Sequence, residues 1–505
     1  MRRIHSFDIF DTLVARRCVE PVRVFEEMER DLHLPGFVRQ RREAEAAVSQ
    51  QAYTLASIYV ELQRRLSWDE ATREHVMAAE IEAEVANAIP VQENLDLVED
   101  GDVLLSDMYL PPDAIRRLLD HVGLARQVGV LVSSHGKHSG SVWPSLRERL
   151  DPEQHAGDNA HADVASATAG GLFGWNSGST HLSPHEQFFR ANGLEQLVRA
   201  VREMRLRGSS AGAGHEALER RLLQVNCNIP LLLLTAVHLK HLARETGARR
   251  ILFSSRDCLY LWRIFQRLSG ELHWDIGSEY FFTSRMARRK ASEDYLRYFD
   301  GLTREPCLVV DLAGTGESLA QLYERAGRAP PTFFVHDVQA MYAKPDKPAS
   351  AARRKMHVLS LSADTQLSNA VLEVANAVPS GMVKDVVLVP GTEGVVPVLE
   401  HPSYPAGVRR LIDEIAATQS EFLRVLDAHD LGRLVNEVSA SAIPALVAEL
   451  YRSLVSSSGV LKHLGEYHGM QNTRTEWRLQ ALASLPRDFM SGGRDHPPSQ
   501  DREPI

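Results

Sequence analysis

Short apolar runs and amphipathic stretches alternate in two separate regions of the chain. The first region begins with a short strand at 3–9 and resumes near residue 102, where strands and helices alternate as far as residue 172. The second region extends from about residue 249 to residue 342. Because strand–helix alternation is typical of parallel sheets covered by helices, the pattern predicts two α/β domains in tandem.

Other parts of the chain have the helical period alone. Apolar residues recur at spacings of three and four from about 20 to 100, at 216–247 and at 405–485, and the first of these stretches is inserted after the first strand. A segment rich in Gly, Ser and Ala separates the two α/β regions. We therefore expect a first domain at 1–204 with a helical cap at about 15–100, a linker at 205–218, a second domain at 219–400, a helical region at 401–488 and a disordered tail at 489–505.

Composition and charge narrow the class of protein. The 505 residues carry a formal net charge of −9, which argues against non-specific nucleic-acid binding. The four cysteines lack the close spacing of zinc or redox motifs. Asp8 and Asp11 interrupt the apolar start, so we expect no export signal, and the longest apolar run, 229–237, is too short to span a bilayer. These features predict a cytoplasmic protein without a transmembrane segment.

Polar side chains follow successive strands of the first region. They are Asp8 in "SFDIFDTLV", Ser106 in "VLLSDMYL", Lys137 in "SSHGKHSG", and Asp158 and Asp163 in "HAGDNAHAD". Because open parallel sheets bind ligands at the carboxyl ends of their strands, we expect these side chains to converge. A carboxylate, a hydroxyl, an ammonium group and two further acids suit nucleophilic attack on a phosphoryl group beside a metal ion.

The order of these motifs resembles the haloacid dehalogenase superfamily over about residues 1–200. The resemblance implies a Rossmann-like fold with a helical cap, Asp8 as the nucleophile, and Mg²⁺ held by Asp8, Asp158 and Asp163. Ser106 would hydrogen-bond the transferring phosphoryl group, and Lys137 would offset its charge. Asp163 would support either the metal shell or Lys137.

One position departs from that family. Its phosphatases usually carry a second aspartate two residues after the nucleophile, and this chain has Phe10 there, followed by Asp11. Three alternatives follow: Asp11 takes over the proton transfer, the domain hydrolyses slowly, or it only binds. A structural alternative for Asp11 is the N-terminal cap of a helix.

A second phosphate-type loop lies in "VVDLAGTGESLAQL" (309–322), where an apolar strand passes into a helix. Glycines allow close approach of the backbone, hydroxyls donate hydrogen bonds, and the helix N-terminus favours an anion. The spacing resembles the 5-phosphoribosyl 1-pyrophosphate (PRPP) loop of phosphoribosyltransferases, although Val310 replaces the first of two usual acids. The resemblance assigns PRPP binding to Asp311, Gly314, Thr315, Gly316, Glu317 and Ser318.

Two further strand ends extend this candidate site. "FSSRD" supplies Ser255, Arg256 and Asp257 where phosphoribosyltransferases hold pyrophosphate, and "TSR" supplies Ser284 and Arg285. Guanidinium groups suit bidentate phosphate binding, so we expect functional roles for both arginines. The following Arg289 and Lys290 are expected to be surface charges. Asp257 or Glu373 is a candidate base for activating an acceptor hydroxyl.

Taken together, the motifs resemble a bacterial two-domain ribofuranosyltransferase family found with surface-polysaccharide genes, over the chain to about residue 390. The resemblance implies transfer of 5-phosphoribose from PRPP to a glycan acceptor, removal of the 5-phosphate by the first domain, and association with polysaccharide assembly enzymes. A second hypothesis is a phosphatase of a sugar phosphate or nucleotide with a C-terminal binding or regulatory module. A third is a non-catalytic scaffold.

Overall fold

A computed structural model describes residues 4–50, 52–212, 214–337, 356–361, 368–392, 394–400 and 404–461. Within them the chain divides into two compact units. The first comprises the chain up to Leu242 together with Tyr260–Ile276 and Glu414–Val460, and the second comprises Ala243–Leu259 and Gly277–Asp413. Each unit contains a five-stranded parallel sheet, so the expected α/β class with parallel sheets is confirmed.

The sheet of the first unit has the strand order β5-β4-β1-β6-β7. Its strands are β1 (His5–Asp8), β4 (Val103–Asp107), β5 (Gly129–Ser133), β6 (Gln154–Gly157) and β7 (Phe173–Asn176). The chain passes from β1 to one side of the sheet and then returns to place β6 on the other side of β1. The carboxyl ends of β1 and β6 therefore form a topological switch point, where α/β sheets bind ligands.

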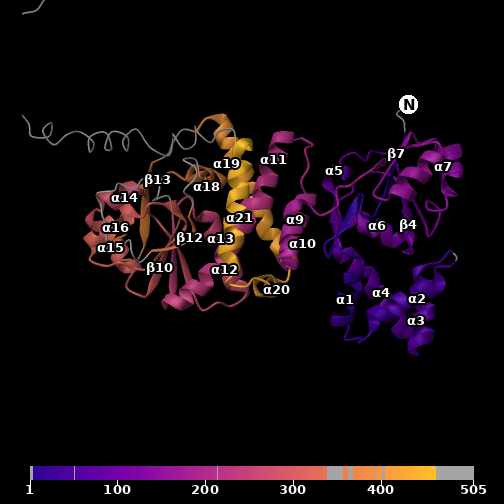
Figure 1. Cartoon of the computed structure of the whole chain (residues 1–505), viewed down its shortest axis with the longest axis horizontal. Helices are drawn as coiled ribbons and strands as arrows, with labels where there is room; N and C mark the ends of the chain where they lie inside the picture. Colours follow the sequence, from indigo (N-terminus) through magenta and orange to yellow (C-terminus); the bar gives the residue numbers. More distant parts are fainter. Residues whose placement is uncertain are drawn as a thin grey trace, which may run out of the picture. The chain divides into compact units, whose positions relative to one another are not determined.

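The helical insertion leaves the sheet after β1. Its helices are α1 (Val22–Asp31), α2 (Phe37–Val48), α3 (Leu55–Leu66) and α4 (Glu70–Asn87), which are indigo in Figure 1. The insertion starts and ends in a two-stranded antiparallel ribbon of β2 (Val14–Arg16) and β3 (Ala88–Pro90). Inside it, Arg41 of α2 forms two hydrogen bonds, of 2.8 and 2.7 Å, with Glu80 of α4, and both side chains are fully buried.

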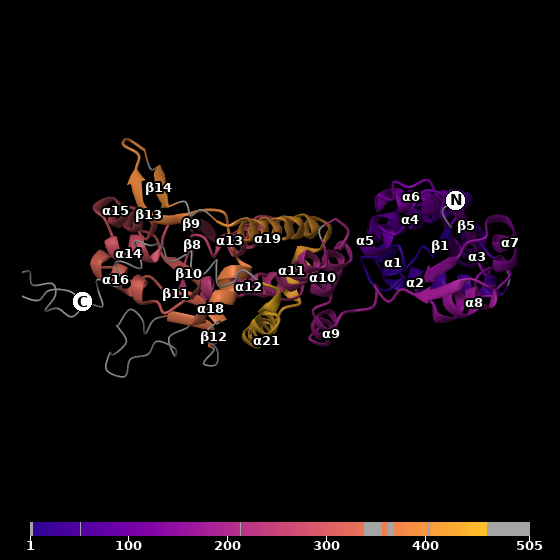
Figure 2. The ribbon, with the colours of Figure 1, turned by 90° about the horizontal axis from the view of Figure 1, so that it is seen from above.

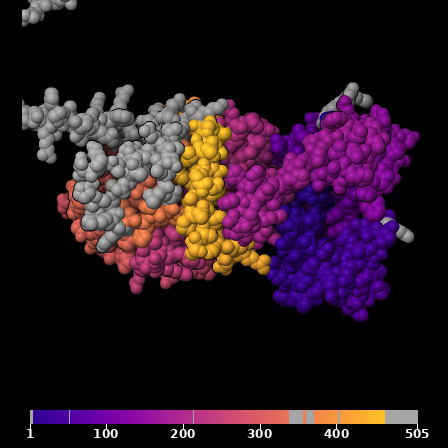
Figure 3. Space-filling model, viewed as in Figure 1, coloured from indigo at the N-terminus to yellow at the C-terminus, as the bar shows by residue number. Residues whose placement is uncertain are grey.

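The first unit contains further helices outside the insertion. They are α5 (Gln92–Leu95), α6 (Pro112–His121), α7 (Val142–Leu150), α8 (Ser166–Ala169), α9 (Pro184–Ala191), α10 (Glu195–Leu206), α11 (His215–Leu223), α13 (Leu259–Glu271), α20 (Leu431–Asn436), α21 (Ile443–Ser456), and most of α12 (Ile229–Thr246) and α19 (Ala406–Val425). Glu203 of α10 accepts hydrogen bonds from Arg17 and Arg207 and pairs with His429. In Figure 3, α21 is the yellow band beside the magenta helices, and it packs against the π-helical segment Gln224–Asn228.

The apolar run at 229–237 is part of the long helical stretch that the helical period predicted at 216–247. Helical structure continues from His215 to Thr246, and by length and composition this stretch is able to cross a membrane. However, 83% of its most apolar window is buried inside the protein. Burial of this kind is typical of a core helix.

The sheet of the second unit has the order β12-β11-β10-β8-β9. Its strands are β8 (Arg250–Ser254), β9 (Gly277–Phe281), β10 (Cys307–Gly314), β11 (Thr332–Asp337) and β12 (Met356–Leu361), and its switch point lies between β8 and β10. Around it lie α14 (Arg285–Lys290), α15 (Glu293–Leu302), α16 (Glu317–Ala326), α18 (Ser368–Ala375) and a hairpin of β13 (Met382–Leu388) and β14 (Val395–Glu400), which Figure 2 shows at the edge of this unit.

Two outcomes concern the segments outside the sheets. The loop between α10 and α11 covers residues 207–214, inside the segment expected as a linker. The helices expected at 405–485 are present as α19, α20 and α21, whereas residues 462–485 and the expected tail lie outside the described residues.

Candidate functional sites

The first candidate site lies at the switch point between β1 and β6. Asp8 is the last residue of β1 and pairs in register with Leu105 of β4, so Ser106 follows one position further along the neighbouring strand. Asp158 directly follows β6, and Asp163 lies in the π-helical turn Ala160–Ala165. The structure therefore brings together at one sheet edge the residues that the motifs predicted.

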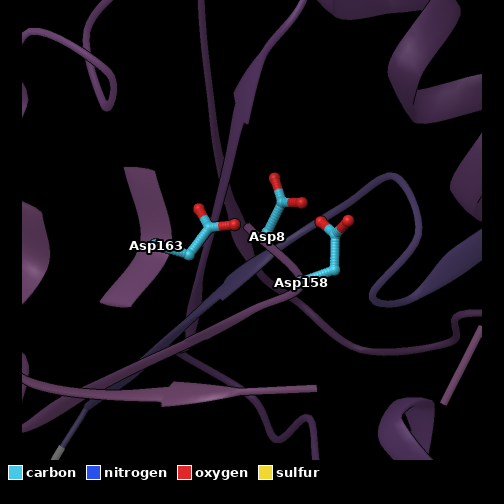
Figure 4. Close-up of side chains that lie close together, drawn as sticks. All are labelled: Asp8, Asp158 and Asp163. Carbon is cyan, nitrogen blue, oxygen red and sulfur yellow. The ribbon is translucent and has the colours of Figure 1, made fainter. Parts of the chain in front are cut away.

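The three aspartates form a compact carboxylate cluster. One oxygen from each of Asp8, Asp158 and Asp163 lies within 4.8 Å of the others, and in Figure 4 the Asp8 carboxyl group is drawn between those of Asp163 and Asp158. Lys137 Nζ, itself buried, donates hydrogen bonds to Asp8 Oδ1 and, at 2.7 Å, to Asp163 Oδ1. The cluster thus combines three acids with one ammonium group.

Asp163 is held by more donors than its neighbours. His155 Nε2 lies 3.2 Å from Asp163 Oδ1, and the backbone N–H of Asn159 donates to Oδ2 at 3.0 Å. His155 is fully buried, and its Nδ1 lies 2.9 Å from the hydroxyl of Ser6 on β1. These contacts favour the role in which Asp163 orients Lys137, and they leave Asp8 and Asp158 as the better-placed metal ligands.

The electrostatics follow from burial and these contacts. Burial raises the pKa of Asp8 above its usual range, although the charge of Lys137 lowers it. Burial raises the pKa of Asp158 to about 6, with a further contribution from the charge of Asp11. Burial also raises the pKa of Asp163, but the hydrogen bond from His155 and the charge of Lys137 outweigh it and hold that pKa below its usual range.

The donor set fits a hard divalent cation. Carboxylate oxygens are the ligands that such ions prefer, and Asp8 and Asp158 are the two acids whose pKa the surroundings raise. A bound cation would favour their ionised forms. The three aspartates lie close enough to one another for their carboxylate oxygens to hold one metal ion together.

Asp11 lies in a turn rather than at the start of a helix. Its φ is 57°, its N–H donates to Val14 O at 2.7 Å, and the next helix starts at Val22, so the interpretation of Asp11 as a helix cap is wrong. Its side chain is 34% exposed, and Arg202 Nη2 lies 4.0 Å from Asp11 Oδ1. The charge of Asp11 contributes to the raised pKa of Asp158, and its partly exposed carboxylate is accessible to solvent.

Phe10, at the position where the resembling phosphatases carry an acid, has a structural contact. The guanidinium group of Arg16 lies 4.4 Å from the centre of its ring, and Arg16 Nε donates to Glu84 of α4 at 2.8 Å. The ring therefore packs against an ion pair that links the ribbon to the helical insertion.

The second candidate site lies at the switch point of the other sheet and centres on Arg288. This buried side chain donates to Asp311 Oδ2 at 3.0 Å and to Ser254 Oγ at 3.1 Å. It also donates to Thr283 Oγ1 at 2.9 Å and to Ser318 Oγ at 3.4 Å. One guanidinium group thus joins the ends of β8, β9 and β10 to the first turn of α16.

A group of acids surrounds this arginine. Burial raises the pKa of Asp257 to about 7; the charge of Arg256 opposes this shift, and the charges of Glu373 and Asp311 add to it. Asp257 Oδ1 is buried and has no hydrogen-bond partner among the described residues. Arg256 has a φ of 70°, and its N–H donates to Tyr280 Oη at 2.5 Å. Strained backbone and a buried unpaired carboxylate oxygen are typical of functional sites.

Several predicted PRPP-binding residues have other contacts. Ser255 bridges two loops, because its hydroxyl donates to Thr283 O and accepts from Thr283 N. Ser284 caps α14 and donates to Val383 O, and Arg285 is exposed. The motifs predicted a site role for Arg285, whereas the structure buries Arg288, three residues further along α14. Residues at this spacing are neighbours on a helix surface, so the sequence does not distinguish them.

The loop at 314–318 is tighter than expected. β10 continues to Gly314, so Asp311 lies within the strand and not after it, paired with Phe334 of β11. Thr315 and Gly316 alone connect β10 to α16, and Glu317 starts the helix with its N–H 3.4 Å from Thr315 Oγ1. Gly316 has a φ of 69°, a left-handed conformation that favours glycine, and a Cβ there would displace the end of the Met356 side chain, whose Sδ would lie 2.5 Å away.

A scan against known protein families found no matching family, and a search of curated proteins found no relative. The family resemblance accordingly stays a prediction from the motifs.

Proposed function

We propose that the first unit is a Mg²⁺-dependent phosphomonoesterase that uses Asp8 as its nucleophile. The observation that carries this proposal is the cluster of Asp8, Asp158 and Asp163 at the switch point of the sheet. Lys137 donates hydrogen bonds to two of these aspartates. A lysine and two acids that could hold a cation surround the buried Asp8 carboxylate. The two positive charges would offset the repulsion between this nucleophile and an anionic phosphoryl group.

The proposed reaction has two steps. An Asp8 oxygen forms a bond to phosphorus while the bond from phosphorus to the leaving oxygen breaks, and Asp11 supplies the proton to that oxygen. Water then attacks the phosphorus of the aspartyl-phosphate and gives its proton to Asp11, while the bond from phosphorus to the Asp8 oxygen breaks and inorganic phosphate leaves. Lys137 and the Ser106 hydroxyl stabilise the transferring oxygens. Mg²⁺ held by Asp8 and Asp158 would neutralise charge on the phosphate when bound.

For the second unit we propose transfer of 5-phosphoribose from PRPP to a glycan hydroxyl. Support comes from a strained loop after β8, a glycine-dependent turn after β10, and a group of buried charges between them at the switch point. The acceptor oxygen would bond to C1 as the bond from C1 to pyrophosphate breaks, and Asp257 would accept the acceptor's proton. The first unit would then remove the 5-phosphate, in the cytoplasm, and the product would pass to polysaccharide assembly enzymes.

One observation favours the second hypothesis, a phosphatase with a C-terminal binding module. Asp311, which the resemblance assigns to the ribose hydroxyls, is already engaged by Arg288. In this case the second unit would bind a phosphorylated sugar without cleaving it.

The decisive experiment supplies the full-length protein with PRPP, Mg²⁺ and a panel of p-nitrophenyl glycosides. Release of pyrophosphate together with a mass increase of one unphosphorylated pentose on an acceptor would support the complete proposal. Hydrolysis of ribose 5-phosphate without any pyrophosphate release would support the second hypothesis.

Substituting Gly157 by Ala is expected to lower phosphatase activity by about 10²-fold, because a displaced catalytic group loses its productive geometry. A Cβ at Gly157 would lie 2.2 Å from Asp163 Cγ, so Asp163 must move away from Lys137. The measurement is hydrolysis of p-nitrophenyl phosphate. Gly129→Ala in β5 is the matched control, since the nearest atom to its Cβ is 3.8 Å away. Equal activity of the two variants would contradict the role assigned to Asp163.

Pyrophosphate release is expected to rise as the pH rises through about 7. The pKa of Asp257 is about 7, so below this pH the carboxyl group is protonated and unable to accept the acceptor's proton. Asp257→Asn should lower the rate by about 10²-fold to 10³-fold and abolish this rise. The exposed Asp300→Asn is the control. An unchanged pH profile in Asp257→Asn would exclude Asp257 as the base.

A further inference from the structure

A cavity of the first unit lies between α7 and the ends of β4 and β5, and its lining includes Ser106 and Lys137 of the first candidate site. Its volume is about 560 Å³, which is within the range of small-molecule sites. Leu105 and Asp107 of β4 pair in register with Leu131 and Ser133 of β5, and these four residues line one wall. Asp8, Asp158 and Asp163 do not line it.

The opposite wall is one stripe of α7. Val142, Ser145, Leu146 and Arg149 are spaced by three and four residues, so they lie on one helix face. Figure 2 shows α7 beside β5 at the outer end of the sheet. From Val142 to Arg149 this face extends over about 10 Å at the rise of an α-helix.

The lining of the cavity combines leucine and valine side chains with four serines, and it has one charge that is available to a ligand. Leu131 is 45% exposed and Leu150 is 41% exposed, which is unusual for leucines that face the same hollow. Asp107 accepts hydrogen bonds from Ser133 Oγ and from the N–H of Lys137, and the Lys137 side chain is bonded to the aspartate cluster. Arg149 is the remaining charged lining residue, and it has no ion pair or hydrogen bond among the described residues.

From this arrangement we infer that the cavity binds a small amphipathic anion. The ligand has an apolar chain about 10 Å long, which covers Leu131 and Leu146, and one carboxylate or phosphate group, which pairs with Arg149. A medium-chain acyl carboxylate has these properties. The cavity adjoins the first candidate site, since Ser106 and Lys137 also line it. The residues assigned to the bound chain and to its anionic group take no part in the proposed phosphatase and transferase activities.

The test is isothermal titration calorimetry of the full-length protein with decanoate, decanol and decylammonium. We expect saturable decanoate binding with a Kd of about 10–100 µM, weaker binding of decanol, and the weakest binding of decylammonium. Arg149→Glu should weaken decanoate binding at least tenfold and leave decanol binding unchanged. Leu131→Asp should weaken the binding of both at least tenfold.

Two matched substitutions control for surface effects. Phe173→Asp changes a side chain that is 66% exposed on β7, at the other edge of the same sheet, and Arg126→Glu changes an exposed arginine outside the cavity. Both should bind decanoate as the wild-type protein does, and circular dichroism should show all four variants folded. Absence of saturable binding, or equal binding by the cavity variants, would overturn the inference. A dimer that Leu131→Asp dissociates would also overturn it, since a second copy would then cover these leucines.

Discussion

Replacing Asp8 by Asn is expected to reduce phosphomonoester hydrolysis by at least about 10³-fold, which corresponds to about 4 kcal/mol in the activation free energy. The amide has the shape of the carboxylate but is a poor nucleophile, so the aspartyl-phosphate does not form. Lys137 keeps its hydrogen bond to Asp163 in this variant, so the fold of the site should persist. The measurement is hydrolysis of p-nitrophenyl phosphate and of ribose 5-phosphate in the presence of Mg²⁺.

The same variant also separates the two proposed activities. If the second unit transfers 5-phosphoribose, Asp8→Asn should accumulate a 5-phosphoribosylated acceptor, which mass spectrometry detects as a pentose carrying a phosphate. Asp113→Asn, which changes an exposed acid of the same unit, should behave as the wild-type protein does. An unphosphorylated ribosyl product from Asp8→Asn would show that another group removes the phosphate.

The first site was accessible to sequence reasoning because its residues follow strand ends. Asp8, Ser106 and Asp158 each lie at or next to the carboxyl end of an apolar segment, and a parallel sheet must bring these ends to one edge. Periodicity also located the helical insertion, since an amphipathic helix has the same pattern in any context. The local sequence pattern was therefore enough to predict the site residues that the parallel sheet brings to one edge.

Residues that act through tertiary contacts were missed. His155 lies within β6 and received no predicted role, although its pairing with Ser6 of β1 places two polar side chains together in the sheet. Arg288 was not predicted because the three arginines of α14 look alike in sequence, and packing buries one of them. The end of β10 was placed too early because Asp311 looks like a loop residue, whereas its ion pair stabilises it inside the strand.

Replacing Arg288 by Ala is expected to destabilise the second unit by about 3–5 kcal/mol, because the substitution leaves the buried Asp311 carboxylate without its cation. It also removes the donor that joins β8, β9, β10 and α16. Hydrogen exchange followed by mass spectrometry, on peptides covering β10 and α14, measures the change for this unit alone. Because the chain has two units, a single unfolding midpoint would not report the stability of the second unit by itself.

The matched control is Arg289→Ala, which removes an exposed arginine from the same helix and should leave exchange within about 0.5 kcal/mol of the wild-type value. The double variant Arg288→Ala with Asp311→Ala removes both charges, so it should recover most of the lost stability. If these residues hold PRPP, the double variant should still release no pyrophosphate, which separates binding from folding. Full protection of β10 in Arg288→Ala alone would show that the ion pair contributes little to the stability of this sheet, and the arginine would then have to be explained by ligand binding alone.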